Sequence, residues 1–315
     1  MSLSSTVILA ITTTQIAALS TTAIANFDAT ELGYLTTTSV NLLDTTQVTS
    51  LNTTQIKGLS TTFLRTLNTT QVSTLTATQV AQLSSTQVSG LETTDVAVLS
   101  TTQIGALSAT SLNALTGSSA TALTTTIISS LSTTQISSFT ATQLNGLGST
   151  NMGVLTTTSV AALTTAQIKG LNSTAFGLLN STQVTALTTA QVAVLSSTHI
   201  DALSTTEVAV LSTTQIGALS VSQLLTFDST QVSALTTTEL ASLTTNQIQG
   251  INTLGVAALT TTQFSTLNSS QIGAFTIAQV GAINSTDVRA LSTTEISVLR
   301  SEEHTSELQS RLHLV

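Results

Sequence analysis

Apolar side chains recur along this chain at alternating spacings of five and three residues, from Leu3 to Leu299, without one insertion or deletion. These spacings define an octapeptide with positions a to h, of which Leu211 to Ala218 is a representative copy. Position a is always Leu, Ile or Phe, and position f is always apolar. Apolar residues five and three apart cannot all lie on one face of a strand, whose side chains alternate with period two.

The polar positions of the octad carry residues that are typical of a helix N-terminus. Position b is Ser, Thr, Asn or Asp except at Glu92 and Gly148, and position e is most often Gln. A hydroxyl or short amide at b can cap a helix, and the Gln three residues later completes a capping box. The apolar residues at a and f then occupy the two positions of a hydrophobic staple. We therefore expect one short helix per octad, running from c to the next a.

The rare charges agree with this interpretation. Every acidic residue before Arg300 except Asp201 falls at b or e, and the basic residues Lys57, Arg65, Lys169 and Arg289 all fall at g. Acids thus gather at the expected helix starts and bases near the ends, as the helix dipole favours. The predicted fold class is all-α, a solenoid or superhelical rod of very short capped helices. The alternative is a β-solenoid, because Thr, Val and Ile are good strand formers.

The octads must stack against one another to fold, because each one is too short to be stable alone. Isolated helices of about two turns are unstable in water. In such a helix positions f and a share a face while g points outward. We expect a Leu, Ile and Val spine inside the superhelix and hydroxyl groups outside.

Composition narrows the function classes. The 315 residues include no Cys, Pro or Trp, 6% are charged, and the net charge is −8. No disulfide, thiol chemistry or Cys-based metal site is possible. The absence of a basic patch argues against nucleic-acid binding. No apolar run approaches the roughly 20 residues of a membrane-spanning helix.

Three segments are expected along the chain. Residues 1–2 are a start or fragment edge with no secretion signal visible, residues 3–299 are the repeat solenoid, and residues 300–315 break the phase. Within the solenoid, Val96 to Ser108 recurs unchanged from Val208 to Ser220, 112 residues later, which indicates duplication of a fourteen-octad block. The tail from Arg300 to Ser310 resembles the in-frame translation of a common sequencing adapter, which implies that it is not native. A charged C-terminal cap helix is the alternative.

A search for chemistry assigns no catalytic, cofactor-binding or metal residue. His199 replaces Gln at position e and is interpreted as a capping-box variant, and no second His or Cys joins it. Glu207 occupies the same position in the next octad, where it satisfies the cap pattern. The degenerate octads at Tyr34, Gly148 and Leu254-Gly255 are interpreted as drift on a repetitive scaffold. No phosphate-binding loop, dinucleotide fingerprint or nucleophile elbow is present.

The octads resemble the Thr/Gln/Leu-rich repeat tracts, of the type Leu-Ser/Thr-Thr-x-Gln-Ile/Val-x-x, of very long bacterial surface or secreted proteins of adhesin type. That resemblance covers Leu3 to Leu299 and implies a non-enzymatic structural spacer or interaction scaffold at the cell surface or outside the cell. The partners it implies are self-association or surface and glycan contacts. The alternative is a binding module in which the regular Thr pairs at c and d contact ice, glycan or a mineral surface.

Overall fold

The computed structural model describes residues 4–299, and every regular element within that range is an α-helix. Each octad forms one helix of four to seven residues, for example α10 (Ala77–Val80) and α37 (Thr293–Leu299). The predicted all-α fold is confirmed, and the β-solenoid alternative is wrong for residues 4–299, which contain no strand. The tail predicted to be adapter-derived and residues 1–3 lie outside the described residues.

The chain divides into two compact units, Met1–Leu163 and Thr164–Val315. The first unit contains α1 (Ser5–Leu9), α2 (Thr13–Ala17), α3 (Thr21–Asn26), α4 (Ala29–Gly33), α5 (Thr37–Asn41), α6 (Thr45–Thr49), α7 (Thr53–Gly58), α8 (Thr61–Thr66), α9 (Thr69–Thr74), α10 (Ala77–Val80), α11 (Ser85–Ser89), α12 (Thr93–Val98), α13 (Thr101–Ala106), α14 (Ala109–Asn113), α15 (Gly117–Ala120), α16 (Thr125–Ser130), α17 (Thr133–Ile136), α18 (Ala141–Gly146), α19 (Gly148–Gly153) and α20 (Thr157–Ala162).

The second unit repeats the same design with helices of the same length. It contains α21 (Thr165–Gly170), α22 (Ser173–Phe176), α23 (Ser181–Thr185), α24 (Thr189–Val192), α25 (Ser197–Asp201), α26 (Thr205–Val208), α27 (Thr213–Gly217), α28 (Val221–Leu225), α29 (Ser229–Ala234), α30 (Thr237–Ser242), α31 (Thr245–Gln249), α32 (Thr253–Ala258), α33 (Thr261–Phe264), α34 (Ser269–Gly273), α35 (Ile277–Ala282), α36 (Ser285–Ala290) and α37 (Thr293–Leu299).

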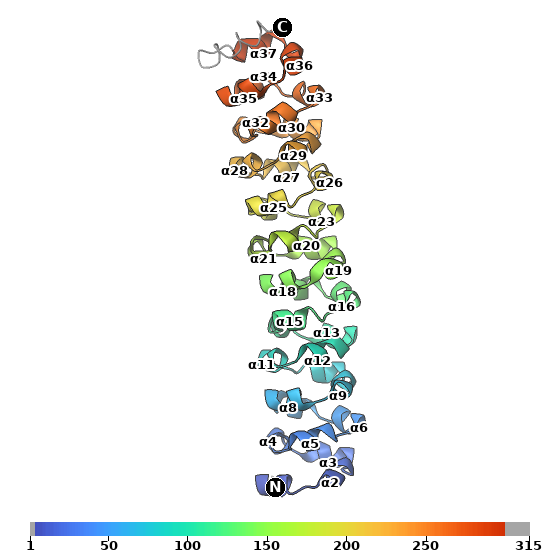
Figure 1. Cartoon of the computed structure of the whole chain (residues 1–315). Helices are drawn as coiled ribbons and strands as arrows, with labels where there is room; N and C mark the ends of the chain where they lie inside the picture. Colours follow the sequence, from blue (N-terminus) through green and yellow to red (C-terminus); the bar gives the residue numbers. More distant parts are fainter. Residues whose placement is uncertain (1–3, 300–315) are drawn as a thin grey trace. The chain divides into compact units, whose positions relative to one another are not determined.

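Within each unit the chain coils so that most helices pack against the helix three positions later. In the first unit α6 lies between α3 and α9, and in the second α29 lies between α26 and α32 (Figure 1). The coil is a solenoid because each octad turns the chain through a similar corner. None of the described helices is long and apolar enough to cross a membrane.

The corner between two helices is made by positions a and b. At the end of α7, Leu59 leaves the helix with φ −61° and ψ 137°, and Ser60 is also extended, with φ −70° and ψ 154°. The Ser60 hydroxyl accepts from the backbone N–H of Phe63 and so starts α8. A Ser or Thr side chain that competes for backbone donors in this way favours helix starts over helix interiors.

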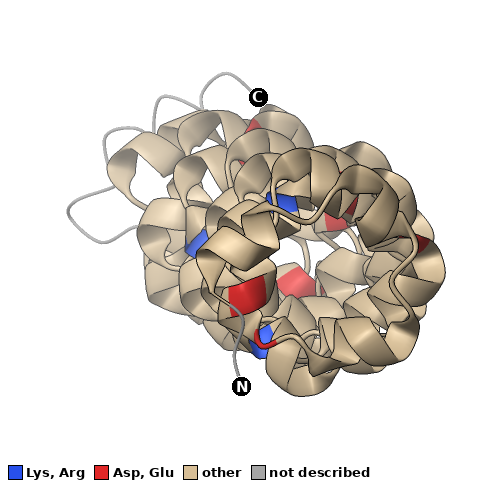
Figure 2. Ribbon diagram, turned by 90° about the horizontal axis from the view of Figure 1, so that it is seen from below, with Lys and Arg blue, Asp and Glu red and all other residues tan. Residues whose placement is uncertain are grey.

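The solenoid interior is formed by positions a and f. Almost every residue at these positions is buried, as Ile216 and Leu219 illustrate with 0% and 3% exposure. The basic side chains at g, Lys57, Arg65 and Lys169, are exposed. Figure 2 shows how sparsely charged residues occur on the ribbon. The expected apolar spine and outward-facing g are therefore observed.

Gly148 replaces the cap of its octad and has a backbone role. Its φ is +73°, and only Leu147 separates α18 from α19 at this point. Side chains with a Cβ rarely adopt that conformation, whereas Gly does so at little cost. The octad that lost its capping residue thus makes its corner with a left-handed Gly.

Proline substitutions inside one octad test the helical register. Ile216→Pro removes the bond from the Ile216 N–H to the Ser212 carbonyl (2.9 Å) and a fully buried side chain. We expect it to lower the free energy of unfolding by at least about 3 kcal/mol. Thr213→Pro is the matched control, because a proline at the first helical residue loses no helix bond and should change stability by less than about 1 kcal/mol. Urea unfolding followed by circular dichroism measures both, and equal effects would contradict the register.

Candidate functional site

The most distinctive feature of the interior is a row of buried Gln side chains at position e. Apart from Gln15, every position-e Gln is at most 9% exposed. Buried amides are stable only when their donors and acceptors find partners. The solenoid therefore needs a specific bond for each end of each amide.

Gln215 shows the arrangement. Its Oε1 accepts from the Ser212 backbone N–H (2.8 Å) and hydroxyl (3.0 Å) at the start of its own helix, α27. Its Nε2 donates to the Val184 carbonyl (3.1 Å) and the Leu187 carbonyl (2.8 Å), both at the end of α23. One amide thus satisfies the N-terminus of one helix and the C-terminus of the helix four positions earlier.

The same bond recurs in both units. Each position-e Gln from Gln47 to Gln143 and from Gln215 to Gln279 donates Nε2 to the position-a carbonyl 28 residues earlier, at 2.6–3.0 Å. Most also reach the position-f carbonyl of the same earlier helix end. We call this set the glutamine ladder. Within each unit its hydrogen bonds link successive turns of the coil.

Other donors stand in for Gln at several rungs. The Ser111 and Ser119 hydroxyls donate to the Leu83 and Leu91 carbonyls at 3.0 and 3.2 Å. Asn151 Nδ2 donates to the Leu123 carbonyl at 2.7 Å. All three donate to position-a carbonyls in the same register as Gln.

Gly255 has no side chain to donate at position e, and the side chain of another residue in the same octad supplies the donor. An added Cβ there would lie 2.8 Å from Val232 Cγ2, so the octad is packed closely around Gly. Nδ2 of the N-cap residue Asn252 donates to the Phe227 carbonyl (2.6 Å) and the Leu225 carbonyl (3.2 Å) instead. The degenerate Leu254-Gly255 octad is thus compensated by its own capping residue.

His199 is also a rung of the ladder. Its Nδ1 accepts from the Ser196 N–H (3.2 Å) and its Nε2 lies 2.7 Å from the Leu171 carbonyl, which requires the Nε2–H tautomer. The ring stacks on Phe176 with centroids 4.8 Å apart. The predicted capping-box role is observed. Glu207 accepts from the Ser204 N–H at 2.8 Å, and no group of three metal-binding side chains occurs among residues 4–299.

Four buried carboxyl groups occupy rungs where a donor would be expected: Glu31, Asp95, Glu239 and Asp287. Glu239 accepts from the Thr236 N–H at 2.6 Å, and burial raises the pKa of its carboxyl above the ordinary 4.5. The helices packed against it, α27 and α33, carry no ionisable side chain. Burial likewise raises the pKa of Asp95. Asp287 is fully buried, and its Oδ1 has no hydrogen-bond partner among the described residues.

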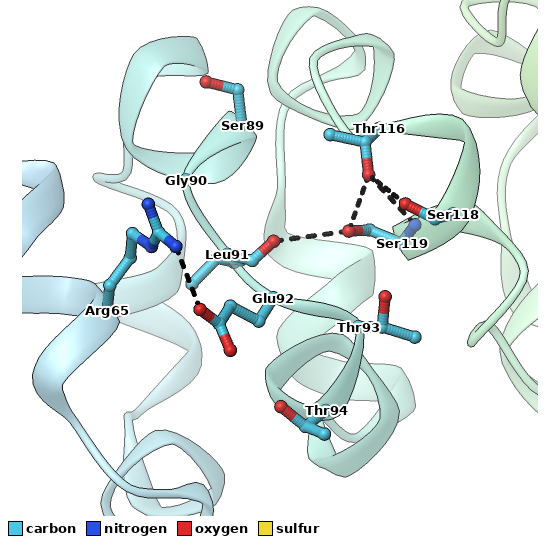
Figure 3. Close-up of a pocket in the computed structure, with 10 residues that line it drawn as sticks. All are labelled: Arg65, Ser89, Gly90, Leu91, Glu92, Thr93, Thr94, Thr116, Ser118 and Ser119. Carbon is cyan, nitrogen blue, oxygen red and sulfur yellow. Dashed lines mark hydrogen bonds and ion pairs between the residues drawn. The ribbon is translucent and has the colours of Figure 1, made fainter.

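An ion pair marks a groove in the first unit. Arg65 at the end of α8 lies 3.1 Å from Glu92, which precedes α12. Ser89 and the hydroxyls around α15 line the same groove, whose volume is about 470 Å³ (Figure 3). Glu92 is the N-cap residue of α12, and its carboxylate accepts a hydrogen bond from the Arg65 guanidinium.

The sequence predicts the hydrogen bond that each Gln Oε1 makes to the start of its own helix. It does not predict the bonds that Nε2 makes to the end of an earlier helix. The capping-box spacing indicates that Gln Oε1 returns to the b backbone, and the structure contains that bond in most octads. Nothing in one octad shows that Nε2 reaches a carbonyl 28 or 31 residues away. The preference for Gln over Glu at position e was the available signal, since both complete a capping box but only Gln carries a donor.

Comparison with known families identifies a repeat tract. Two adjacent stretches, residues 157–189 and 189–221, match the ALTTAQ repeat. Neither the curated proteins nor the solved structures contain a match to this chain. The chain is therefore a helical repeat protein whose matched repeats indicate a structural or interaction module.

Removing one rung tests the ladder. Gln215→Met keeps the side-chain length but removes the amide partner of the Ser212 N–H and of the Leu187 carbonyl. The Val184 carbonyl still accepts from the Leu187 N–H. We expect a loss of roughly 1–3 kcal/mol for each buried group left unpaired. Gln15→Met is the matched control, because Gln15 is exposed and makes only the cap bonds. It should cost less than about 1 kcal/mol in urea unfolding, and an equal loss in both variants would argue against the long-range bond.

Glu239→Gln should stabilise the protein in a pH-dependent manner. The raised pKa means that the folded state binds the proton more tightly than the unfolded chain. The destabilisation by Glu239 is therefore absent below pH 4.5 and complete above the raised pKa. Restoring an amide should add about 1 kcal/mol at pH 7, and the gain should shrink as the pH falls. Gln231→Glu, the reverse change on a rung with two 2.8 Å bonds, should lose stability as pH rises. Unfolding curves at several pH values measure both, and pH-independent differences would refute the mechanism.

Proposed function

We propose that this chain is a non-enzymatic structural spacer of a larger surface or secreted bacterial protein. The single observation that supports this role best is the glutamine ladder, because within each unit the same side-chain hydrogen bond links successive turns of the coil. Adding octads lengthens such a coil without any new interface. Stability in repeat arrays of this kind is a sum of repeat and nearest-neighbour terms, so length can change freely.

The surface chemistry agrees with a spacer. The outward positions c, d and g carry Thr, Ser and small residues with few charges. A neutral hydroxyl surface stays hydrated and offers no strong electrostatic attraction to nucleic acid or to oppositely charged partners. The block duplication seen in the sequence is also a direct way to lengthen a spacer.

A binding module is the second candidate, and the exposed Thr pairs favour it. Thr213 and Thr214 are both exposed at the start of α27, and the same pair recurs at many helix starts. A regular hydroxyl array of this kind could contact ice, glycan or a mineral surface. Thermal hysteresis in a freezing assay supports the ice-binding role, and its absence removes that role.

Cell labelling together with a shortened chain tests the spacer. Antibodies raised against the repeats should label intact source cells as strongly as permeabilised cells. Deleting four whole octads, Leu203–Ala234, should preserve the helical circular dichroism and reduce the maximum dimension in small-angle scattering in proportion to the residues removed. A deletion of half an octad, Leu211–Thr214, is the control and should destabilise the fold because it breaks the register. Labelling only after permeabilisation would overturn the surface assignment.

A further inference from the structure

All three ionisable side chains between Gly58 and Ile168 come together at one place on the solenoid. The Arg65 guanidinium lies 3.1 Å from the Glu92 carboxylate, and Asp95 accepts from the Glu92 backbone N–H at 3.0 Å. Arg65 and Glu92 are 27 residues apart in sequence and sit on adjacent turns. In a chain this poor in charge, their meeting is a departure from the repeat pattern.

Stability does not account for the pair. The side chains of Arg65 and Glu92 are 58% and 54% exposed, and exposed ion pairs contribute only about 0–1 kcal/mol. Glu92 also replaces the usual Ser, Thr, Asn or Asp at the cap of α12. This departure from the usual cap residues places a carboxylate beside Arg65.

The opposite wall of the groove is formed by a second unusual octad. Gly117, Ser118 and Ser119 follow the cap residue Thr116, where most octads have Thr-Thr-Gln. The short Ser119 side chain donates to the Leu91 carbonyl at 3.2 Å, whereas a Gln would extend to the neighbouring helix-end carbonyls as well. The Thr116 hydroxyl is hydrogen-bonded to the Ser118 hydroxyl at 3.0 Å and to the Ser119 hydroxyl at 2.9 Å. The short side chains leave an open groove of about 470 Å³ between the two walls (Figure 3).

The chemistry of the groove indicates what class of ligand it fits. Arg65 offers N–H donors, Glu92 offers acceptors, and the hydroxyls offer both. The two exposed groups, Arg65 and Glu92, carry opposite charges, and Asp95 is buried. Neither an anion nor a cation therefore gains strongly from the exposed surface of this site. A neutral ligand rich in hydroxyl groups can accept from the guanidinium and donate to the carboxylate at once. The volume lies within the roughly 300–1,000 Å³ typical of small-molecule sites.

We propose that the groove between Arg65, Glu92 and the Thr116–Ser119 segment binds a neutral sugar ring. Arg65 and Glu92 form hydrogen bonds with adjacent sugar hydroxyls, and the hydroxyl groups around α15 form hydrogen bonds with the opposite edge of the ring. No aromatic side chain lines the groove to stack on the sugar. Affinity therefore comes from hydrogen bonds in an open site, and we expect dissociation constants of about 1 mM or weaker.

Saturation-transfer NMR on the full chain tests the proposal with three probes, the methyl pyranosides of glucose, mannose and galactose. At least one should receive saturation from the wild-type protein. Arg65→Ala combined with Glu92→Gln should reduce that signal about tenfold while leaving the fold intact, because both side chains are exposed. Lys57→Ala is the matched control, an exposed base at the same octad position one repeat earlier, and should retain the full signal.

A second variant separates loss of binding from loss of folding. Ser119→Gln introduces the rung used elsewhere in the ladder, fills the groove wall and should raise the melting temperature while abolishing the sugar signal. The proposal is overturned if no pyranoside receives saturation at tens of millimolar. It is also overturned if the Arg65/Glu92 double variant binds as well as Lys57→Ala. Sugar binding and the spacer role are independent, so failure of one leaves the other standing.

Discussion

The bond that the rest of the structure depends on is the one made by the position-e amide between two helix ends. A helix of five residues leaves most of its backbone N–H and C=O groups without intrahelical partners. A solenoid of such helices would bury many of these groups unpaired, at about 1–3 kcal/mol each. The Gln amide resolves this because its acceptor serves one helix start and its donor serves another helix end.

The rungs that depart from Gln show which side chains the position accepts. Ser111, Asn151 and His199 differ in size and chemistry, yet each presents a donor to a position-a carbonyl. Where Gly255 supplies none, the Asn252 amide does so from the cap position. Buried carboxyl groups such as Glu239 offer no donor when ionised, and burial raises the pKa of Glu239. The buried apolar residues Phe63, Ile127 and Ala175 also occupy position e, so a donor is common at this position but not required at every rung.

Repetition and departure from repetition carry different functional information. The uniform rungs and the neutral Thr-rich surface suit a module whose length matters more than any single residue. The groove beside Arg65 differs because two departures converge there: a charged pair that includes the cap residue Glu92, and an octad of short side chains. Drift at unrelated positions would scatter such departures along the coil. Their convergence is the reason for assigning the groove a ligand of its own.

The sequence by itself determined the local structure. The b and e residues, such as Ser212 and Gln215, specify where each helix begins, and the a and f residues specify which face is buried, because both effects act within one octad. Only the tertiary structure decided how the octads meet, since the number of octads per turn depends on the packing of helices far apart in sequence. Three contacts depend on how many octads make one turn. They are the hydrogen bonds donated by Gln215 Nε2, the bond that Asn252 makes because Gly255 has no side chain, and the Arg65–Glu92 ion pair. The physical reason is that capping is a local interaction, whereas the pairing of helix ends 28 to 31 residues apart exists only once the chain has coiled.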